Sequence, residues 1–124
     1  MPRKPINFET VREIALALPG VVASMGARGM AFKVRGKMIA CKAIHRSAEQ
    51  GSLVVRIDPA RRAELLATDP ETYYVTAHYE PYAAVLVRLD RVSRAAVTRL
   101  LGESRLFVSG EPRAARASSK GPRG

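Results

Sequence analysis

The chain has 124 residues but only one cysteine, two histidines, few aromatic residues and no tryptophan. The single thiol, Cys41, excludes an intramolecular disulfide and any zinc site built from several thiolates, and it is typical of a reducing compartment. No stretch approaches the roughly 18 apolar residues of a membrane span, and the N-terminus lacks the apolar run of a signal peptide. We therefore expect a cytoplasmic protein with no membrane contact.

Groups that carry enzyme chemistry are also scarce. Cys41 precedes His45 by four residues, a separation of about 13 Å on an extended strand, which is too long for a thiol–imidazole pair. His78 is the only other histidine, and Asp58 is explained by capping a helix. No spacing of metal ligands is present. The sequence therefore predicts a protein that is not an enzyme and that uses no metal or other cofactor.

Positive charge is the excess in this composition, with a formal net charge of +10 at pH 7. Such a balance indicates affinity for nucleic acid or another anionic surface, but it indicates neither a fold nor a sequence preference. The densest basic stretch holds six cations between residues 28 and 46 and no acidic residue. These are the predicted nucleic-acid-binding residues: Arg28, Lys33, Arg35, Lys37, Lys42 and Arg46.

The middle of this stretch has the pattern of a β-hairpin. Apolar and basic residues alternate on both sides of Arg35-Gly36, and glycine tolerates the positive φ that a tight turn requires. A three-residue loop with a bulge would place Lys33 opposite Lys37, and two opposed lysines would favour a polyanion that neutralises both. A two-residue loop would instead place Val34 opposite Lys37 and give a less uniform basic face.

Capping residues and apolar periodicity predict the other elements. Asn7, Asp58 and Ser93 each have the character of a helix N-cap, and Gly102 is expected to end the last helix. Residues 21 to 30 are expected to form an irregular lead into the hairpin. The further expected strands are Leu53 to Ile57, which should be central, Tyr73 to Ala77, and Ala83 to Leu89.

The end of the chain has a different composition. From residue 110 to 124 it consists mainly of Gly, Pro, Ala, Ser and basic residues, with too little apolar surface to offset the entropy of ordering. We expect a single folded domain over residues 1–109 and a disordered basic tail over residues 110–124.

His78 lies in sequence among the four tyrosines of the chain. In one interpretation some of these rings fill the core and His78 anchors a loop through a backbone hydrogen bond. In the other, exposed rings stack on bases or on an apolar group, and His78 supplies a polar contact. The candidate residues for such a ligand or partner groove are His78 and Tyr82.

The order and spacing of several phrases resemble the MmcQ/YjbR family of small, bacterial-type proteins. The phrases are Leu18-Pro19-Gly20, Phe32-Lys33-Val34, Gly36-Lys37, Leu53 to Ile57, Leu65-Leu66, Ala77-His78 and Val85 to Leu89, and the resemblance covers roughly residues 7 to 108. It implies an α+β fold of the CyaY-like type, an antiparallel sheet with helices packed on one face, and a DNA-binding protein. Iron-binding frataxins share that fold but rely on an acidic helix, so we do not extend iron binding to this chain.

Two functions follow from the sequence. The first is a monomeric, non-enzymatic protein that contacts the phosphates of double-stranded DNA through the basic hairpin, with little sequence readout. The alternative is a protein-interaction or small-ligand-binding module that uses the sheet face or the Tyr/His loop. Phosphate binding releases counterions, so a steep salt dependence distinguishes the first from the second.

Overall fold

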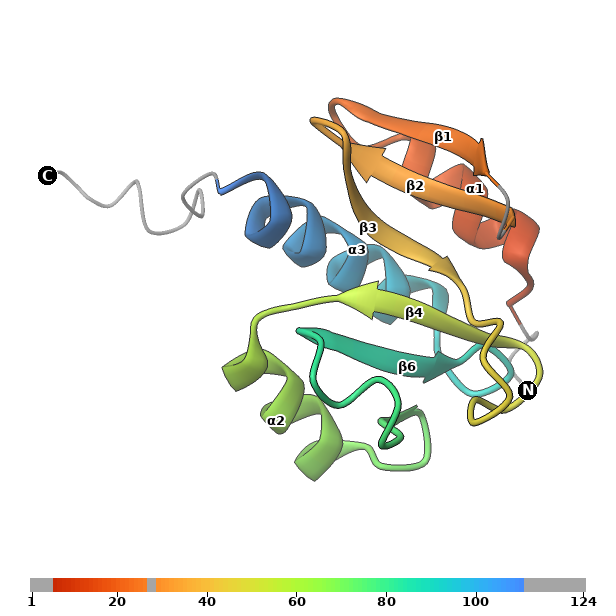
Figure 1. Cartoon of the computed structure of the whole chain (residues 1–124), viewed down its shortest axis with the longest axis vertical. Helices are drawn as coiled ribbons and strands as arrows, with labels where there is room; N and C mark the ends of the chain where they lie inside the picture. The colour runs from red at the N-terminus through yellow and green to blue at the C-terminus, as the bar shows by residue number, and fades with distance from the viewer. Residues whose placement is uncertain (1–5, 27–28, 111–124) are drawn as a thin grey trace, which may run out of the picture.

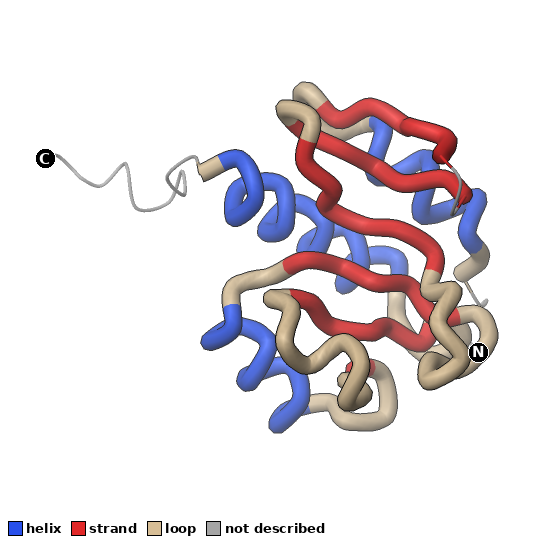
Figure 2. The backbone as a smooth tube through the Cα atoms, in the orientation of Figure 1, coloured by secondary structure: helices blue, strands red, loops and turns tan. Residues whose placement is uncertain are grey.

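The computed structural model describes residues 6–26 and 29–110, which form an α+β fold. Its strands make one antiparallel sheet of six strands in the order β1-β2-β3-β4-β6-β5 (Figures 1 and 2). Helices α1 and α3 pass behind the sheet in Figure 1, and α2 lies beside β6. The elements are α1 (Phe8–Leu16), β1 (Val21–Gly26), β2 (Gly29–Val34), β3 (Lys37–Lys42), β4 (Ser52–Arg56), α2 (Pro59–Thr68), β5 (Tyr73–Tyr74), β6 (Ala84–Arg88) and α3 (Arg94–Ser109).

Each predicted N-cap is confirmed by a hydrogen bond from the first helical turn. The side chain of Asn7 accepts from the Thr10 amide at 2.9 Å, and Oδ1 of Asp58 accepts from the Ala60 amide at 2.9 Å. The Ser93 hydroxyl accepts from the Ala96 amide at 3.0 Å. These bonds satisfy backbone donors that have no partner inside a helix, which is why local sequence predicts the starts so well.

The predicted end of the last helix is wrong. α3 runs through Gly102 to Ser109 and ends at Gly110, which has a φ of 79°. Leu101, before the glycine, and Val108, after it, are both buried in the core. Burial on both sides of Gly102 outweighs the roughly 1 kcal/mol by which glycine disfavours a helix interior.

Two strand predictions also need correction. Residues 21–26, predicted to be irregular, form the edge strand β1, which pairs with β2 from Val21 opposite Val34 to Gly26 opposite Gly29. The strand predicted over residues 73–77 is only the two residues of β5. After Tyr74 the chain leaves the sheet and turns, with the amides of residues 79 and 80 bonded to the carbonyl of residue 76.

The β2–β3 hairpin adopts the register with a two-residue loop. Val34 pairs with Lys37, and the turn residues Arg35 and Gly36 have φ values of 54° and 78°. Positive φ at both central positions is the type I′ geometry, whose twist suits a hairpin. A bulge follows at Ile39, whose carbonyl accepts a hydrogen bond from the buried Ser104 hydroxyl of α3 at 3.1 Å.

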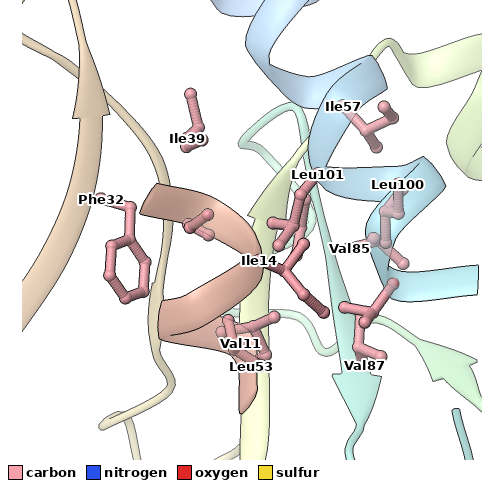
Figure 3. Close-up of a cluster of buried hydrophobic side chains, with 14 of the residues drawn as sticks. Val11, Ile14, Phe32, Ile39, Leu53, Ile57, Val85, Val87, Leu100 and Leu101 are labelled. Atoms are coloured by element: carbon pink, nitrogen blue, oxygen red, sulfur yellow. The ribbon is translucent and has the colours of Figure 1, made fainter. Parts of the chain in front are cut away.

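The main core fills the space between the sheet and the helices (Figure 3). A smaller cluster on the opposite, outer face is built on Val54 and Leu86 and is covered by residues of the loops 43–51 and 75–83. β4 and β6 are therefore buried on both faces, and Cys41 of β3 packs against the smaller cluster. No described helix covers the outer face of β1 and β2 in Figure 1. Within the described ranges, no helix is long and apolar enough to cross a membrane.

Candidate functional site

The two halves of the sheet differ in charge. Residues 14 to 48, which include β1, β2 and β3, contain no acidic residue. Arginines of the other half lie against carboxylates: Arg61 lies 3.0 Å from Glu103, and Arg88 lies 2.7 Å from Glu49. Ion pairs therefore offset part of the positive charge in the second half, whereas residues 14 to 48 of the first half offer no acidic partner.

The predicted cations do not share one face of the hairpin. Lys33 pairs with Met38 on the outer face. Lys37 and Lys42 pair with core-facing residues of β2 and β4, so both lie on the helix side, at opposite ends of β3. The bulge at Ile39 is the reason that Lys37 and Lys42 share the helix side, because one extra residue reverses the alternation of faces along β3.

The remaining predicted cations lie away from the strands. Arg35 occupies the turn and Arg46 the loop that follows β3, while Arg28 lies outside the described residues. In the described part of the chain, no carboxylate forms an ion pair with Lys33, Lys37, Lys42 or Arg46. The arrangement is thus a set of unneutralised cations distributed around β3.

The only two histidines of the chain meet on the outer side of the sheet. The rings of His45 and His78 stack with centroids 3.5 Å apart and planes 6° from parallel. His45 Nδ1 accepts from the Ser47 amide at 3.0 Å, and the Ser47 hydroxyl lies 2.8 Å from that of Thr76. These contacts join the loop 43–51 to the loop 75–83.

Three of the tyrosines have structural roles, one in the main core and two beside the histidine pair. Tyr73 is buried in the main core, and the Tyr74 hydroxyl accepts from the Glu49 amide at 2.8 Å. The Tyr79 hydroxyl accepts from the amide of His45 at 3.3 Å. Hydrogen bonds or core packing thus give each of these rings a structural role.

Tyr82 differs from the other tyrosines because 58% of its surface is exposed. Its ring centroid lies 6.2 Å from that of His78, which is also exposed. The two residues predicted for a groove are therefore close together and on the surface. Sequence analysis missed His45 as the partner of His78, because neither spacing nor periodicity connects the two loops.

Two arginines hold the loops in place. Arg62 donates to the carbonyls of Glu80, Tyr82 and Ala84 at 3.3, 2.8 and 3.1 Å. Arg88 donates to both carboxylate oxygens of Glu49 at 2.9 and 2.7 Å, and this hydrogen bonding lowers the pKa of Glu49. The segment with Tyr82 is thereby attached to α2, and the segment with Glu49 is attached to β6.

The surroundings of His45 disfavour its protonation. Desolvation, followed by the charges of His78 and Arg46, lowers the pKa of His45. No group of three or more His, Cys, Asp or Glu side chains that could hold a metal occurs within residues 6–26 and 29–110. The histidine pair and Tyr82 form a group of aromatic rings at the surface, next to the cation Arg46. Such a group can stack on a planar ring or bind an anion.

Two hollows of the described chain each contain an ion pair. One of about 220 Å³ lies between β5 and the start of α3 and includes Glu71 and Arg91, which are 3.7 Å apart. Another of about 210 Å³ lies between α2 and α3 around the Arg61–Glu103 ion pair. Neither of these two hollows includes the histidine pair.

Comparisons with known proteins agree with this fold. The chain is similar to the crystal structure of Deinococcus radiodurans protein DR2400, which carries a domain named DUF419, with a TM-score of 0.69 and 25% identity over 90% of this chain and 86% of that chain. No curated protein matches it. A family model described as YjbR matches residues 16–106, from the end of α1 into α3, and therefore includes the whole sheet. The resemblance seen in the sequence is thereby confirmed, and this chain belongs to the YjbR family.

Proposed function

We propose that this protein binds double-stranded DNA without catalysing a reaction, by contacting phosphates through the cations around β3. The observation that carries the proposal is the charge difference between the halves of the sheet. Lys33, Lys37, Lys42 and Arg46 form no ion pair in the described part of the chain, and no acidic residue lies between residues 14 and 48. A polyanion gains most where cations are not already neutralised.

The scattered placement of these cations supports phosphate contacts more than base readout. Lys37 and Lys42 are separated by about 16 Å along β3, and a duplex carries one charge per about 1.7 Å of its axis. Each of the two lysines can therefore reach a different phosphate of the same duplex. Base edges are read by side chains that enter a groove together, and cations on two faces of a sheet do not provide this. Little sequence preference follows.

The test is a titration of a labelled random duplex at several salt concentrations. If each of the four cations contacts one phosphate, the logarithm of affinity falls with that of salt with a slope of about −3.6. The double change Lys37→Ala with Lys42→Ala should reduce this slope by about 1.8. Absent binding, or binding that does not respond to salt, would contradict the proposal.

A matched control separates this site from net charge alone. Arg12 and Arg94 are exposed cations on α1 and α3 that already pair with Glu9 and Glu13. Changing both to alanine removes as much charge as the lysine variant does. The control should retain most of the affinity and slope, whereas equal losses in the two variants would assign binding to net charge.

A second function, the binding of a ligand or partner with planar rings, is favoured by the exposed pair of His78 and Tyr82. Stacking on an unpaired base contributes about 1–3 kcal/mol and needs a ring that is both exposed and held in place. The Tyr82 ring is exposed, and Arg62 holds the backbone of the segment that carries it by donating to the Tyr82 carbonyl. The probe is a random single-stranded oligonucleotide. Its affinity should fall about 5-fold or more in Tyr82→Ala and be kept in Tyr82→Phe, since stacking requires only the ring.

If His78 and Tyr82 instead have only a structural role, the opposite result is expected: stability is lost and binding is kept. In that case the double change His78→Ala with Tyr82→Ala lowers the thermal midpoint by several degrees, which corresponds to about 1 kcal/mol in a domain of this size. Binding measured at low temperature persists. That result would assign both rings to folding. An unchanged midpoint with lost binding supports the ligand surface.

A further inference from the structure

The aromatic rings on the outer side of the sheet lie next to a cation that we assign to phosphate contacts. Arg46 follows His45 directly in the chain and is exposed. Desolvation, and then the charges of His78 and Arg46, lower the pKa of His45, so the guanidinium is near enough to the stacked imidazoles to act on them. A phosphate held by Arg46 would therefore bring its nucleotide close to these rings.

The rings of His45, His78 and Tyr82, which we call the ring group, are anchored to the fold and partly exposed. The imidazoles stack with centroids 3.5 Å apart, and the Tyr79 ring lies edge-on to His78 at 4.8 Å. Arg62 donates to the carbonyl of Tyr82, whose side chain is 58% exposed. His78 is also exposed, so the group presents ring surface at two positions.

The charges around the ring group favour a ligand that combines a planar ring with negative charge. Two carboxylates of the neighbouring loops already lie against arginines: Glu49 is 2.7 Å from Arg88, and Glu80 is 3.8 Å from Arg62. Arg46 forms no ion pair in the described part of the chain. A nucleotide supplies both the ring and the charge, whereas an apolar peptide supplies neither the charge nor a partner for Arg46.

A paired base inside a duplex cannot stack on such rings. Its two faces are covered by the neighbouring base pairs, and only its edges are open in the grooves. A protein ring can stack only on a base that has left the duplex or lies in a single strand, and this strengthens binding by roughly 5- to 150-fold per base. The ring group therefore adds affinity only at unpaired nucleotides.

The cations around β3 are more effective on a duplex than on a single strand. A duplex carries one charge per about 1.7 Å of its axis, against one per about 3.4 Å for each of its strands. Lys42 precedes His45 by three residues, so their Cα atoms are at most about 11 Å apart. That length corresponds to about three nucleotides of one strand. A strand that contacts Lys42 can thus reach the ring group within a few nucleotides.

We propose that the preferred ligand of this protein is a DNA duplex with a single-stranded extension. The cations around β3 hold the paired part, and the ring group stacks on the first unpaired bases. This inference rests on the proposed binding of duplex phosphates and adds a site that distinguishes one DNA structure from another. It requires no sequence preference, because every base has a face that can stack.

The test compares the affinities of the full chain for three labelled ligands at one salt concentration. They are a blunt random duplex, the same duplex with a short single-stranded extension, and the same extension built from abasic nucleotides. The last two ligands have equal numbers of phosphates and differ only in the unpaired bases. The natural chain should bind the extension with bases at least about 5-fold more tightly than the abasic one.

Variants assign this ratio of affinities to the ring group. Tyr82→Ala should bring the ratio close to one, and Tyr82→Phe should keep it, because stacking requires only the ring. The double change Lys37→Ala with Lys42→Ala should weaken binding to both extended ligands by similar factors, so the ratio stays the same. A ratio that falls equally in Tyr82→Ala and Tyr82→Phe would contradict stacking.

Two results would overturn the inference while leaving the proposed phosphate contacts in place. One is equal affinity of the natural chain for the two extensions while the blunt duplex is still bound. This comparison needs no variant and so does not depend on how a variant folds. The other is a free single strand that binds as tightly as the extended duplex, because the paired part would then add nothing. Absent binding to the blunt duplex would instead overturn the proposed function itself.

Discussion

His45 shows how a single residue connects this fold to pH. Its pKa is lowered from 6.5 by desolvation and by the charges of His78 and Arg46, so the folded chain binds fewer protons there than the unfolded chain. The free energy of unfolding should therefore fall as pH drops through about 6.5, the value expected for the unfolded chain. Asparagine can keep the acceptor for the Ser47 amide but does not titrate.

The prediction is that His45→Asn makes stability less dependent on pH between about 5 and 7. Urea unfolding at several pH values measures it. Glu49 does not affect the measurement in this pH range. Its pKa is lowered in the folded chain, so its contribution to the free energy of unfolding is lost only below about pH 4.5. A variant with the same pH dependence as the natural chain would show that the histidine contacts do not affect the folding equilibrium.

Arg35 is a second residue whose backbone determines its effect. It is the one residue other than glycine with positive φ in the described chain, at 54°. A left-handed conformation is costly for most side chains and much less so for asparagine. Arg35→Asn should therefore raise the free energy of unfolding by about 0.5–1 kcal/mol. Arg35→Ala, which removes the same charge, should not, and an equal gain in both variants would attribute the effect to charge.

At the scale of elements, the bulge in β3 and helix α3 depend on each other. Ile39 has no partner across the hairpin, and the Ser104 hydroxyl satisfies its carbonyl in a fully buried setting. Ser104→Ala should lower the free energy of unfolding by about 1–3 kcal/mol, because a buried acceptor then loses its donor. Thr98→Ala, on the exposed side of the same helix, is the control and should change stability little. If both changes have the same effect, the bond contributes nothing specific.

At the scale of the whole molecule, DNA affinity could come from the fold or from the tail predicted over residues 110–124. Removing residues 111–124 spares Gly110, the C-cap of α3, and deletes Arg113, Arg116, Lys120 and Arg123. Truncation should weaken binding to the random duplex modestly, and less than changing Lys37 and Lys42 does. If truncation abolishes binding and the lysine changes do nothing, the folded domain has another function.

Local interactions are the part of this molecule that could be read without coordinates. Asn7, Asp58 and Ser93 each satisfy a backbone donor two or three residues away, so their roles as caps depend on their own neighbourhoods. The same is true of the turn at Gly36, where the backbone requires a positive φ. β4 was expected to be central, and its confirmed place follows from an apolar run that can be buried on both faces.

The candidate site could be predicted only in part. His78 and Tyr82 were identified because aromatic residues are rare in this chain and cluster in one segment. The six cations were identified by their density, but their directions depend on the register and the bulge of the hairpin. Both registers were compatible with the sequence, and the structure has the one with Val34 opposite Lys37, followed by a bulge at Ile39.

The sequence by itself thus determined the helix starts, the turn, the buried strands and the excess of positive charge, because each depends on residues close together in the chain or on composition. Tertiary structure alone decided that residues 21–26 pair as β1, that α3 continues past Gly102, and that His45 stacks on His78. Each of these outcomes depends on contacts between segments that are far apart in sequence. The free energy of such contacts exceeds local preferences of about 1 kcal/mol, so no local pattern could have predicted them.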